Sequence, residues 1–155
     1  MEKQIFQETP DCHRSTSVRQ DIYYMSDVGL LRAKSKVSPD TIIDENDLYI
    51  RFKGAFAENY VLNELRATGK EPFFWRSGNT AEIDFIYESK SRIIPVEVKS
   101  ADNTQAKSYK QFCGKYSPQK GFKLSRKNIA RNMCENTSTI SLPLYLAWNM
   151  DEYCE

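Results

Sequence analysis

The sequence predicts an α/β domain in which helices flank a mixed sheet of about four strands, in the order α-β-β-β-α-β. Three observations predict this class. A helical apolar period runs through RFKGAFAENYVLNELRATGK, three β-like runs follow it, and a second helical stretch separates these from a further β-like run. This succession favours one sheet that is covered by helices.

The first predicted helix begins near Tyr49 and ends at Gly69, a residue type that commonly stops helices. At about 100° per residue, the apolar residues fall on one arc: Ala55, Val61, Leu62 and Leu65. Polar residues lie largely off this arc: Lys53, Asn59, Asn63 and Glu64. Glu58 projects into the middle of the arc, although burying an unpaired charge is costly. We therefore expect Glu58 either to pair with an Arg or Lys or to join other acidic residues in a site.

Three strands are predicted after this helix. The first is the aromatic run PFFWRS at residues 72–77, which breaks at Ser77-Gly78-Asn79. The other two lie within AEIDFIYESKSRIIPVEVKS, residues 81–100, where the polar turn Ser89-Lys90-Ser91 joins them. These two strands are expected to pair as a hairpin.

Acidic residues and a lysine occupy matching positions on the two strands. Because side chains alternate between the faces of a strand, Ile83 and Phe85 are expected together on the face opposite to Asp84. By the same rule, Glu97 and Lys99 point the same way. A hairpin would bring a carboxylate from each strand beside an ammonium group. Two hard oxygen ligands and one positive charge are the minimum needed to hold a divalent metal against a phosphodiester.

The remaining elements complete the predicted sheet and its cover. A second helix is expected from about Thr104 to Tyr116, with Thr104 as its cap. A fourth strand follows at residues 121–125. The tail at residues 140–153 has a helix-compatible apolar group after Pro143, which is expected to close the core.

We predict two parts in the chain: a lead-in and domain-junction segment at residues 1–48, and the α/β domain at residues 49–155. The first 20 residues are polar and show no periodicity. Residues 22–33 form a short apolar element, which is either a subdomain edge or a surface that expects another domain. Residues 37–47 are acidic and rich in turn-forming residues, as in a connector.

Composition restricts the class of protein. The net charge of the 155 residues is +1, so binding of a polyanion would need a local basic patch. No apolar run is long enough to span a membrane, and the first residues lack the apolar core of a signal peptide. The four cysteines show no C-x-x-C pair, which predicts free thiols in a cytoplasmic protein and no zinc site.

In this helix-strand-strand order, the residues Glu58, Asp84, Glu97 and Lys99 resemble the motif of the PD-(D/E)xK nuclease superfamily. The resemblance implies a restriction-endonuclease-like core. It implies that Asp84 and Glu97 bind Mg²⁺ or Mn²⁺ and that Glu58 supports the metal from the first core helix. Lys99 would position or polarise the attacking water. Ile83 stands where many members of the superfamily have a proline before the first acid.

Three further residues are candidates for contact with nucleic acid. Gln105 and Tyr109, one helical turn apart, resemble the Q-x-x-x-Y element that follows the E-x-K strand in recombination-type nucleases, although a chance match remains the alternative. Arg76 precedes the turn that leads into Asp84, so we expect it to contact phosphate. Most lysines of the chain are expected to form a solvated surface instead.

A second resemblance is at the level of a family. The chain resembles the uncharacterised domain found behind the ATPase module in a large group of prokaryotic AAA-type ATPases, in the pieces IYYMSDVGLL, FKGAFAENYVLNEL, FFWRSGNTAEIDFI, IIPVEVKSADNT, KGFKLS and SLPLYLAW. It implies an N-terminal ATPase domain as a partner that is missing here. In agreement, the chain has no G-x-x-x-x-G-K-[ST] loop and is not expected to hydrolyse ATP alone.

Two functions follow from these patterns. The first is a C-terminal nuclease-like domain that binds nucleic acid through a metal and hydrolyses DNA phosphodiesters. The second is a non-catalytic regulatory or interaction module of the ATPase that keeps the nuclease fold, with its acids in a structural ion-pair cluster. The apolar IYYMSDVGLL segment also suggests association of the chain with itself.

Overall fold

The computed structural model describes residues 6–7, 24–38, 40, 47–77, 81–100 and 106–154. Its elements are β1 (Phe6–Gln7), α1 (Val28–Lys34), α3 (Asp47–Ala67), β2 (Phe73–Ser77), β3 (Ala81–Ser89), β4 (Arg92–Val98), α4 (Lys107–Tyr116), β5 (Lys120–Ser125), β6 (Ala130–Cys134), β7 (Thr137–Pro143) and the 3₁₀ helix η1 (Leu144–Cys154). Within these ranges, no helix is both long enough and apolar enough to cross a membrane.

The strands form one mixed sheet in the order β1-β2-β3-β4-β5-β7-β6. The hairpins β2–β3, β3–β4 and β6–β7 are antiparallel, whereas β1–β2, β4–β5 and β5–β7 are parallel. The α/β class and the succession from α3 to β5 agree with the prediction. The expected count of about four strands is wrong, because the sheet has seven. The side chains of β6 are almost all exposed, so its sequence carries no alternating apolar signal.

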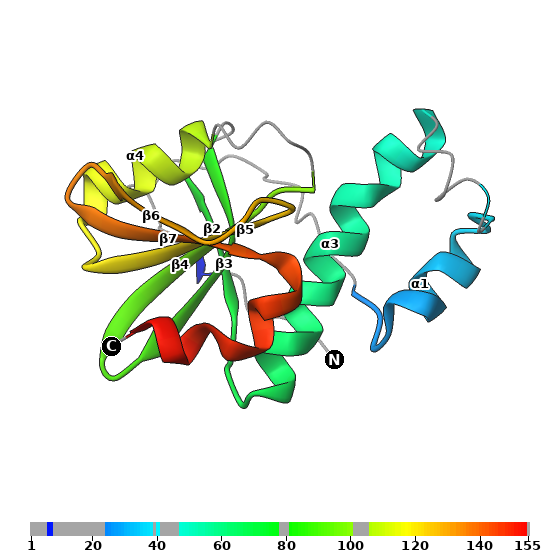
Figure 1. The fold of residues 1–155 in the computed structure, drawn as a ribbon, viewed down its shortest axis with the longest axis horizontal. Coiled ribbons are helices and arrows are strands. Elements are labelled where there is room, and N and C mark those ends of the chain that lie inside the picture. The colour runs from blue at the N-terminus through cyan, green and yellow to red at the C-terminus, as the bar shows by residue number, and fades with distance from the viewer. Residues whose placement is uncertain are drawn as a thin grey trace, which may run out of the picture.

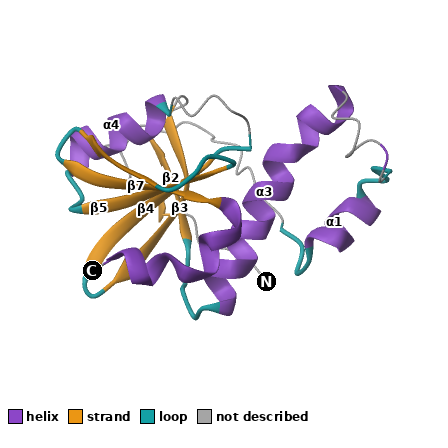
Figure 2. Ribbon diagram, viewed as in Figure 1, coloured by secondary structure: helices purple, strands orange, loops and turns teal. Residues whose placement is uncertain are grey.

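Helices cover both faces of this sheet (Figures 1 and 2). On one face, α3 and η1 pack on a core that includes Leu62, Phe85 and Met150. On the other face, α4 covers a smaller cluster that includes Trp75 and Phe112. Figure 1 shows α1 on the side of α3 that is turned away from the sheet. The predicted tail helix is present as η1, which begins directly after Pro143.

The end of α3 confirms the predicted stop at Gly69. Gly69 has a φ of +76°, which is unstrained for glycine. Its N–H donates to the carbonyl of Arg66 at 3.0 Å, and the N–H of Lys70 donates to the carbonyl of Leu65 at 2.9 Å. These are the two hydrogen bonds of a Schellman motif.

Two positions on α3 differ from the predicted helical arc. Ala55 is exposed, and Asn59 is fully buried. The amide of Asn59 is satisfied by the backbone of Met25: its Oδ1 accepts from the Met25 N–H at 2.7 Å, and its Nδ2 donates to the Met25 carbonyl at 3.1 Å. A helical wheel cannot predict this burial, because the partner comes from a segment 34 residues away.

The predicted hairpin of β3 and β4 is present, with a two-residue turn at Lys90 and Ser91. Ser89 pairs with Arg92, and both turn residues have positive φ angles, 50° and 59°. Positive φ at both positions is the requirement of a type I′ turn, whose twist suits a β-hairpin.

The expectation that Ile83 and Phe85 share a face is wrong, because β3 contains a β-bulge. Trp75 pairs with Ile83 and Phe73 pairs with Ile86, so β2 advances two residues while β3 advances three. One extra residue reverses the alternation of side chains. Ile83 consequently belongs to the cluster under α4, whereas Phe85 belongs to the core under α3. Asp84 lies at this bulge.

Two glycine substitutions should change stability in opposite directions. A Cβ at Gly121 would collide with the Tyr109 hydroxyl and lie 2.9 Å from Cγ of Pro95, so we expect Gly121→Ala to lower the free energy of unfolding by about 1–3 kcal/mol. Gly114, within α4, has room for a Cβ, so Gly114→Ala should raise it by about 0.5–1 kcal/mol. Chemical denaturation measures both. Equal effects of the two changes would contradict this packing.

Candidate functional site

The candidate site lies where β3 and β4 part, next to the bulge. The last registered pair of the two strands toward this end is Phe85 with Val96. Beyond it, the N–H of Val98 donates to Oδ2 of Asp84 at 2.7 Å. The N–H of Lys99 donates instead to the Leu124 carbonyl of β5 at 2.8 Å. The Asp84 side chain thus replaces a backbone partner at the fork between the strands.

Glu97 and Lys99 form an ion pair at this fork. Glu97 Oε1 lies 2.6 Å from Nζ of Lys99, and the side chain of Glu97 is only 3% exposed against 31% for Lys99. The other carboxylate oxygen, Glu97 Oε2, is buried and has no hydrogen-bond partner among the described residues. A buried polar atom without a partner is uncommon in folded proteins and costs stability.

Negative charges act on one another across the site. Burial, followed by the charges of Glu97 and Glu58, raises the pKa of Asp84 well above its usual range. Burial and the charge of Glu82 raise the pKa of Glu58, with Lys99 in opposition. Burial also raises the pKa of Glu97, which the hydrogen bond and charge of Lys99 oppose. The three predicted acids therefore share one electrostatic environment.

The lysine of the site remains charged. Burial alone would lower the pKa of Lys99, but the hydrogen bond and charge of Glu97 outweigh it. The charges of Asp84 and Glu58 act in the same direction, so the pKa of Lys99 lies above its usual value. Lys99 is therefore suited to stabilising negative charge and unsuited to accepting a proton near neutral pH.

The structure brings the four predicted residues Glu58, Asp84, Glu97 and Lys99 into one neighbourhood. Among the residues that the structure describes, however, no three His, Cys, Asp or Glu side chains already form a group able to hold a metal ion. Oxygen donors fit Mg²⁺ and Mn²⁺ in chemistry. The buried Oε2 of Glu97 is one such oxygen, and it has no hydrogen-bond partner among the described residues.

The predicted nucleic-acid contacts are placed differently. Arg76 on β2 is half-exposed and forms an ion pair with Glu82 on β3 at 2.9 Å. Tyr109 is fully buried on the side of α4 that faces the sheet, where its hydroxyl lies 3.1 Å from Oγ1 of Thr139. Nucleic acid could reach Tyr109 only if α4 moved, so its placement gives no support to the predicted contact. Gln105 lies outside the described residues.

Tyr24 also lies at the site, although no sequence pattern predicted a role for it. Its ring stacks on Phe74 at 5.7 Å and lies 6.1 Å from Phe85. A hydrogen bond from Tyr24 lowers the pKa of Glu58, which opposes the effect of burial. Burial and the charges of Glu58 and Asp84 in turn raise the pKa of Tyr24. Two adjacent tyrosines in a short apolar segment carry no signal for such a role.

Comparison with known proteins places the chain in a family. A family described as Domain of unknown function (DUF4143) matches residues 53–145, which is more than half of the chain. The chain belongs to the DUF4143 family. No curated protein and no solved structure matches it. The matched span of this DUF4143 protein contains the four gathered residues at positions 58, 84, 97 and 99 but begins after Tyr24.

The charge of Asp84 should destabilise this protein at neutral pH. Because the folded state raises its pKa, the folded state holds the proton more tightly, and stability falls as the pH rises from the unfolded value near 4 through the folded pKa. Asp84→Asn keeps an acceptor for the Val98 N–H without the charge. We expect its Tm at pH 8 to exceed that of the wild type by roughly 2–4 °C, or about 1 kcal/mol, and the difference to vanish below pH 4.

Thermal unfolding at pH 3.5, 6 and 8 measures this difference. Glu88→Gln is the matched control, since Glu88 is an exposed carboxyl on the same strand, and its Tm should follow the wild type at every pH. A lower Tm of Asp84→Asn at pH 8 would contradict the assignment of a destabilising charge.

Proposed function

We propose that this DUF4143 domain binds Mg²⁺ or Mn²⁺ at Asp84, Glu97 and Glu58 and uses the ion to bind nucleic acid and hydrolyse its phosphodiesters. The observation that carries the proposal is Glu97 Oε2, which is buried without a hydrogen-bond partner among the described residues. It lies beside other carboxyl groups whose pKa values are raised. A cation would supply the missing partner and offset the mutual repulsion.

Each side chain has a role that follows from its contacts. Oδ2 of Asp84 is held by the Val98 N–H, which leaves Oδ1 for a ligand. Glu97 would offer Oε2, because Oε1 pairs with Lys99. Glu58 belongs to α3, and Tyr24 acts on its carboxyl by lowering the pKa. A bound Mg²⁺ supplies charge neutralisation at the phosphate and a water of lowered pKa.

Lys99 would act on the phosphate electrostatically. Its ammonium group is held against Glu97 and remains protonated, so it would stabilise the charge that develops on the attacked phosphate and help to position the water. The succession of α3, three strands, α4 and β5 supports a restriction-endonuclease-like core for this chemistry. The resemblance to domains of AAA-type ATPases supports a role beside an N-terminal ATPase domain.

A non-catalytic interaction module is the second candidate, and two observations favour it. The ion pair of Glu97 and Lys99 is short and largely buried, as in a structural charge cluster. Helix α1 has no buried residue, and Leu30 on it is 52% exposed. An apolar helix surface of this kind suits a contact with another domain or a second copy of the chain.

Metal binding should be visible as thermal stabilisation. A ligand at 100 times its Kd stabilises the folded state by about 2.7 kcal/mol, so we expect saturating Mg²⁺ or Mn²⁺ to raise the Tm by about 5–10 °C. Glu97→Gln and Asp84→Asn should lose this rise, and Glu88→Gln should keep it. Scanning calorimetry with and without EDTA makes the measurement. An undiminished rise in both site variants would refute the assignment.

Cleavage should depend on Lys99 separately from metal binding. Lys99→Met keeps the aliphatic stem but removes the charge, so we expect it to retain the metal-dependent rise in Tm and to lose at least about 100-fold in cleavage rate. Nicking of supercoiled plasmid in Mn²⁺ measures the rate, with Lys110→Met on the exposed side of α4 as control. If wild-type protein is inert on single-stranded and duplex DNA and on RNA, the interaction module is the better assignment.

A further inference from the structure

A second concave site opens at the carboxyl ends of the central strands, as the candidate site does. This cavity is an open depression of about 420 Å³ on the surface. It is lined by Tyr60, Ser125, Arg126, Pro143, Leu144 and Tyr145. Ser125 ends β5 and Pro143 ends β7, so the cavity lies at the carboxyl ends of two neighbouring parallel strands.

The strand ends that line the cavity are neighbours of β4, whose Glu97 pairs with Lys123 on the face of the sheet that α4 covers. Val98 of β4 pairs with Leu124 of β5, which pairs with Leu142 of β7. Neighbouring strands are about 4.8 Å apart, so two strand spacings, about 10 Å, separate the end of β4 from the end of β7. At about 3.4 Å per stacked nucleotide, this separation corresponds to about three nucleotides of one strand.

Exposed aromatic rings stand beside the cavity. Tyr145 is 67% exposed and Trp148 is 52% exposed, although both are large and apolar. Side chains three residues apart in a 3₁₀ helix lie on the same side, so these two rings form one ridge on η1. Ala147 and Met150 occupy the opposite, buried side. Exposed rings in such a row are suited to stacking on nucleic-acid bases.

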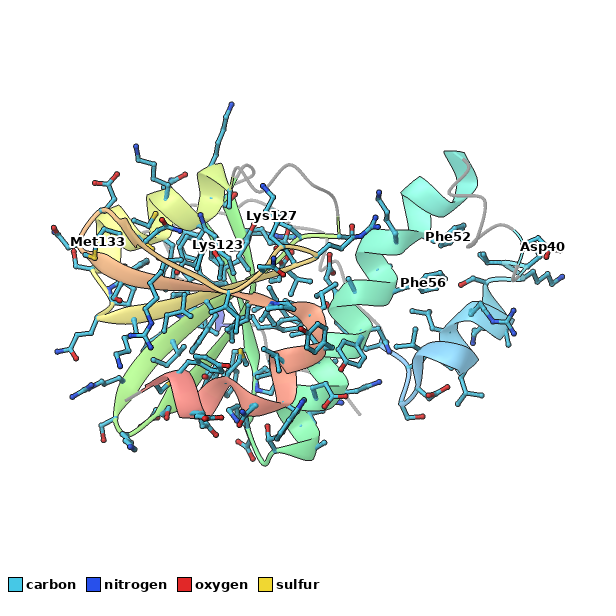
Figure 3. All side chains as sticks on the ribbon, viewed as in Figure 1. Asp40, Phe52, Phe56, Lys123, Lys127 and Met133 are labelled. Carbon is cyan, nitrogen blue, oxygen red and sulfur yellow. The ribbon has the colours of Figure 1, made fainter. Side chains whose placement is uncertain are left out.

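Positive charge borders the same cavity. Arg126 lines it, and Lys127 follows in the turn after β5. The Lys127 N–H donates to Oγ of Ser125 at 3.1 Å, which holds the turn in shape. Figure 3 shows Lys127 nearer to α3 than Lys123, which lies within β5. Basic side chains next to aromatic rings are the combination that binds a single strand.

We propose that this cavity is a nucleotide subsite for a single strand of nucleic acid. Tyr145 stacks on a base, with Tyr60 on the inner wall, and Arg126 contacts the adjacent phosphate. The strand then runs along the carboxyl ends of β5 and β4 toward Glu97 and Lys99. The direction of the strand rests on the proposed hydrolysis, whereas binding in the cavity does not require the metal.

Binding of fluorescein-labelled oligo-dT and oligo-U of 12 nucleotides, measured by fluorescence anisotropy in EDTA, tests this subsite. Stacking contributes about 1–3 kcal/mol per base, so we expect Tyr145→Ala to raise the Kd about tenfold or more. Arg126→Ala should also weaken binding and reduce its salt dependence. Tyr145→Trp should bind as the wild type does. The relative affinity for the two oligonucleotides distinguishes DNA from RNA as the source of the strand.

Arg92→Ala is the matched control. Arg92 is an exposed arginine at the start of β4, at the opposite end of the strand from the carboxyl ends that line the cavity. Unchanged affinity in both Tyr145→Ala and Arg126→Ala, no binding by the wild type, or an equal loss in Arg92→Ala would overturn the proposal. Glu88→Gln, at an exposed carboxyl on β3 outside both sites, should bind both oligonucleotides in EDTA as the wild type does. If oligonucleotide binding is intact but the metal-dependent Tm rise is absent, the proposed hydrolysis fails and the subsite stands. If the metal-dependent Tm rise is present but the wild type binds neither oligonucleotide, the metal site stands and the subsite fails.

Discussion

The hydrogen bond from the Val98 N–H to Oδ2 of Asp84, 2.7 Å long, ties together the two strands that carry Asp84, Glu97 and Lys99. It forms where the bulge in β3 ends the backbone pairing of β3 with β4. Glu97 and Lys99 are the immediate neighbours of Val98, so holding Val98 also places them. At the same point β4 continues its pairing with β5. The fork between the strands thus carries both acidic and basic side chains of the site.

This arrangement has a cost in stability. Several carboxyl groups at the fork have raised pKa values, chiefly through burial, which the charge of Lys99 and, at Glu97, that of Lys123 oppose. The core beneath α3, which includes Leu62, Phe85 and Phe122, buries enough apolar surface to support such a site.

The segment before α1 is tied directly to the site. Asn59 holds the backbone of Met25 with two hydrogen bonds, and this places Tyr24 against Glu58. The segment was expected to be a domain junction, and it also lies before the residues that match the family. Any displacement of this segment would therefore change the environment of the Glu58 carboxyl. The segment before α1 and the acidic site are therefore physically linked through Asn59 and Tyr24.

Local patterns were sufficient for part of this structure. The stop of α3 at Gly69, the turn at Lys90 and Ser91, and the succession from α3 to β5 follow from backbone preference and periodicity, which depend on adjacent residues alone. The neighbourhood of Glu58, Asp84, Glu97 and Lys99 was likewise predictable, because an acid in a helical apolar arc and acids on paired strands are visible in sequence.

Only the tertiary structure decided the features that depend on distant partners. The burial of Asn59 requires the Met25 backbone, and the face of Phe85 requires the unequal advance of β2 and β3. The β6 strand has exposed side chains and exists because β7 offers it an edge. Tyr24 and the cavity beside Tyr145 likewise bring together elements far apart in the chain. Contacts of this range leave no periodic trace in the sequence, since periodicity records only which face of an element is apolar.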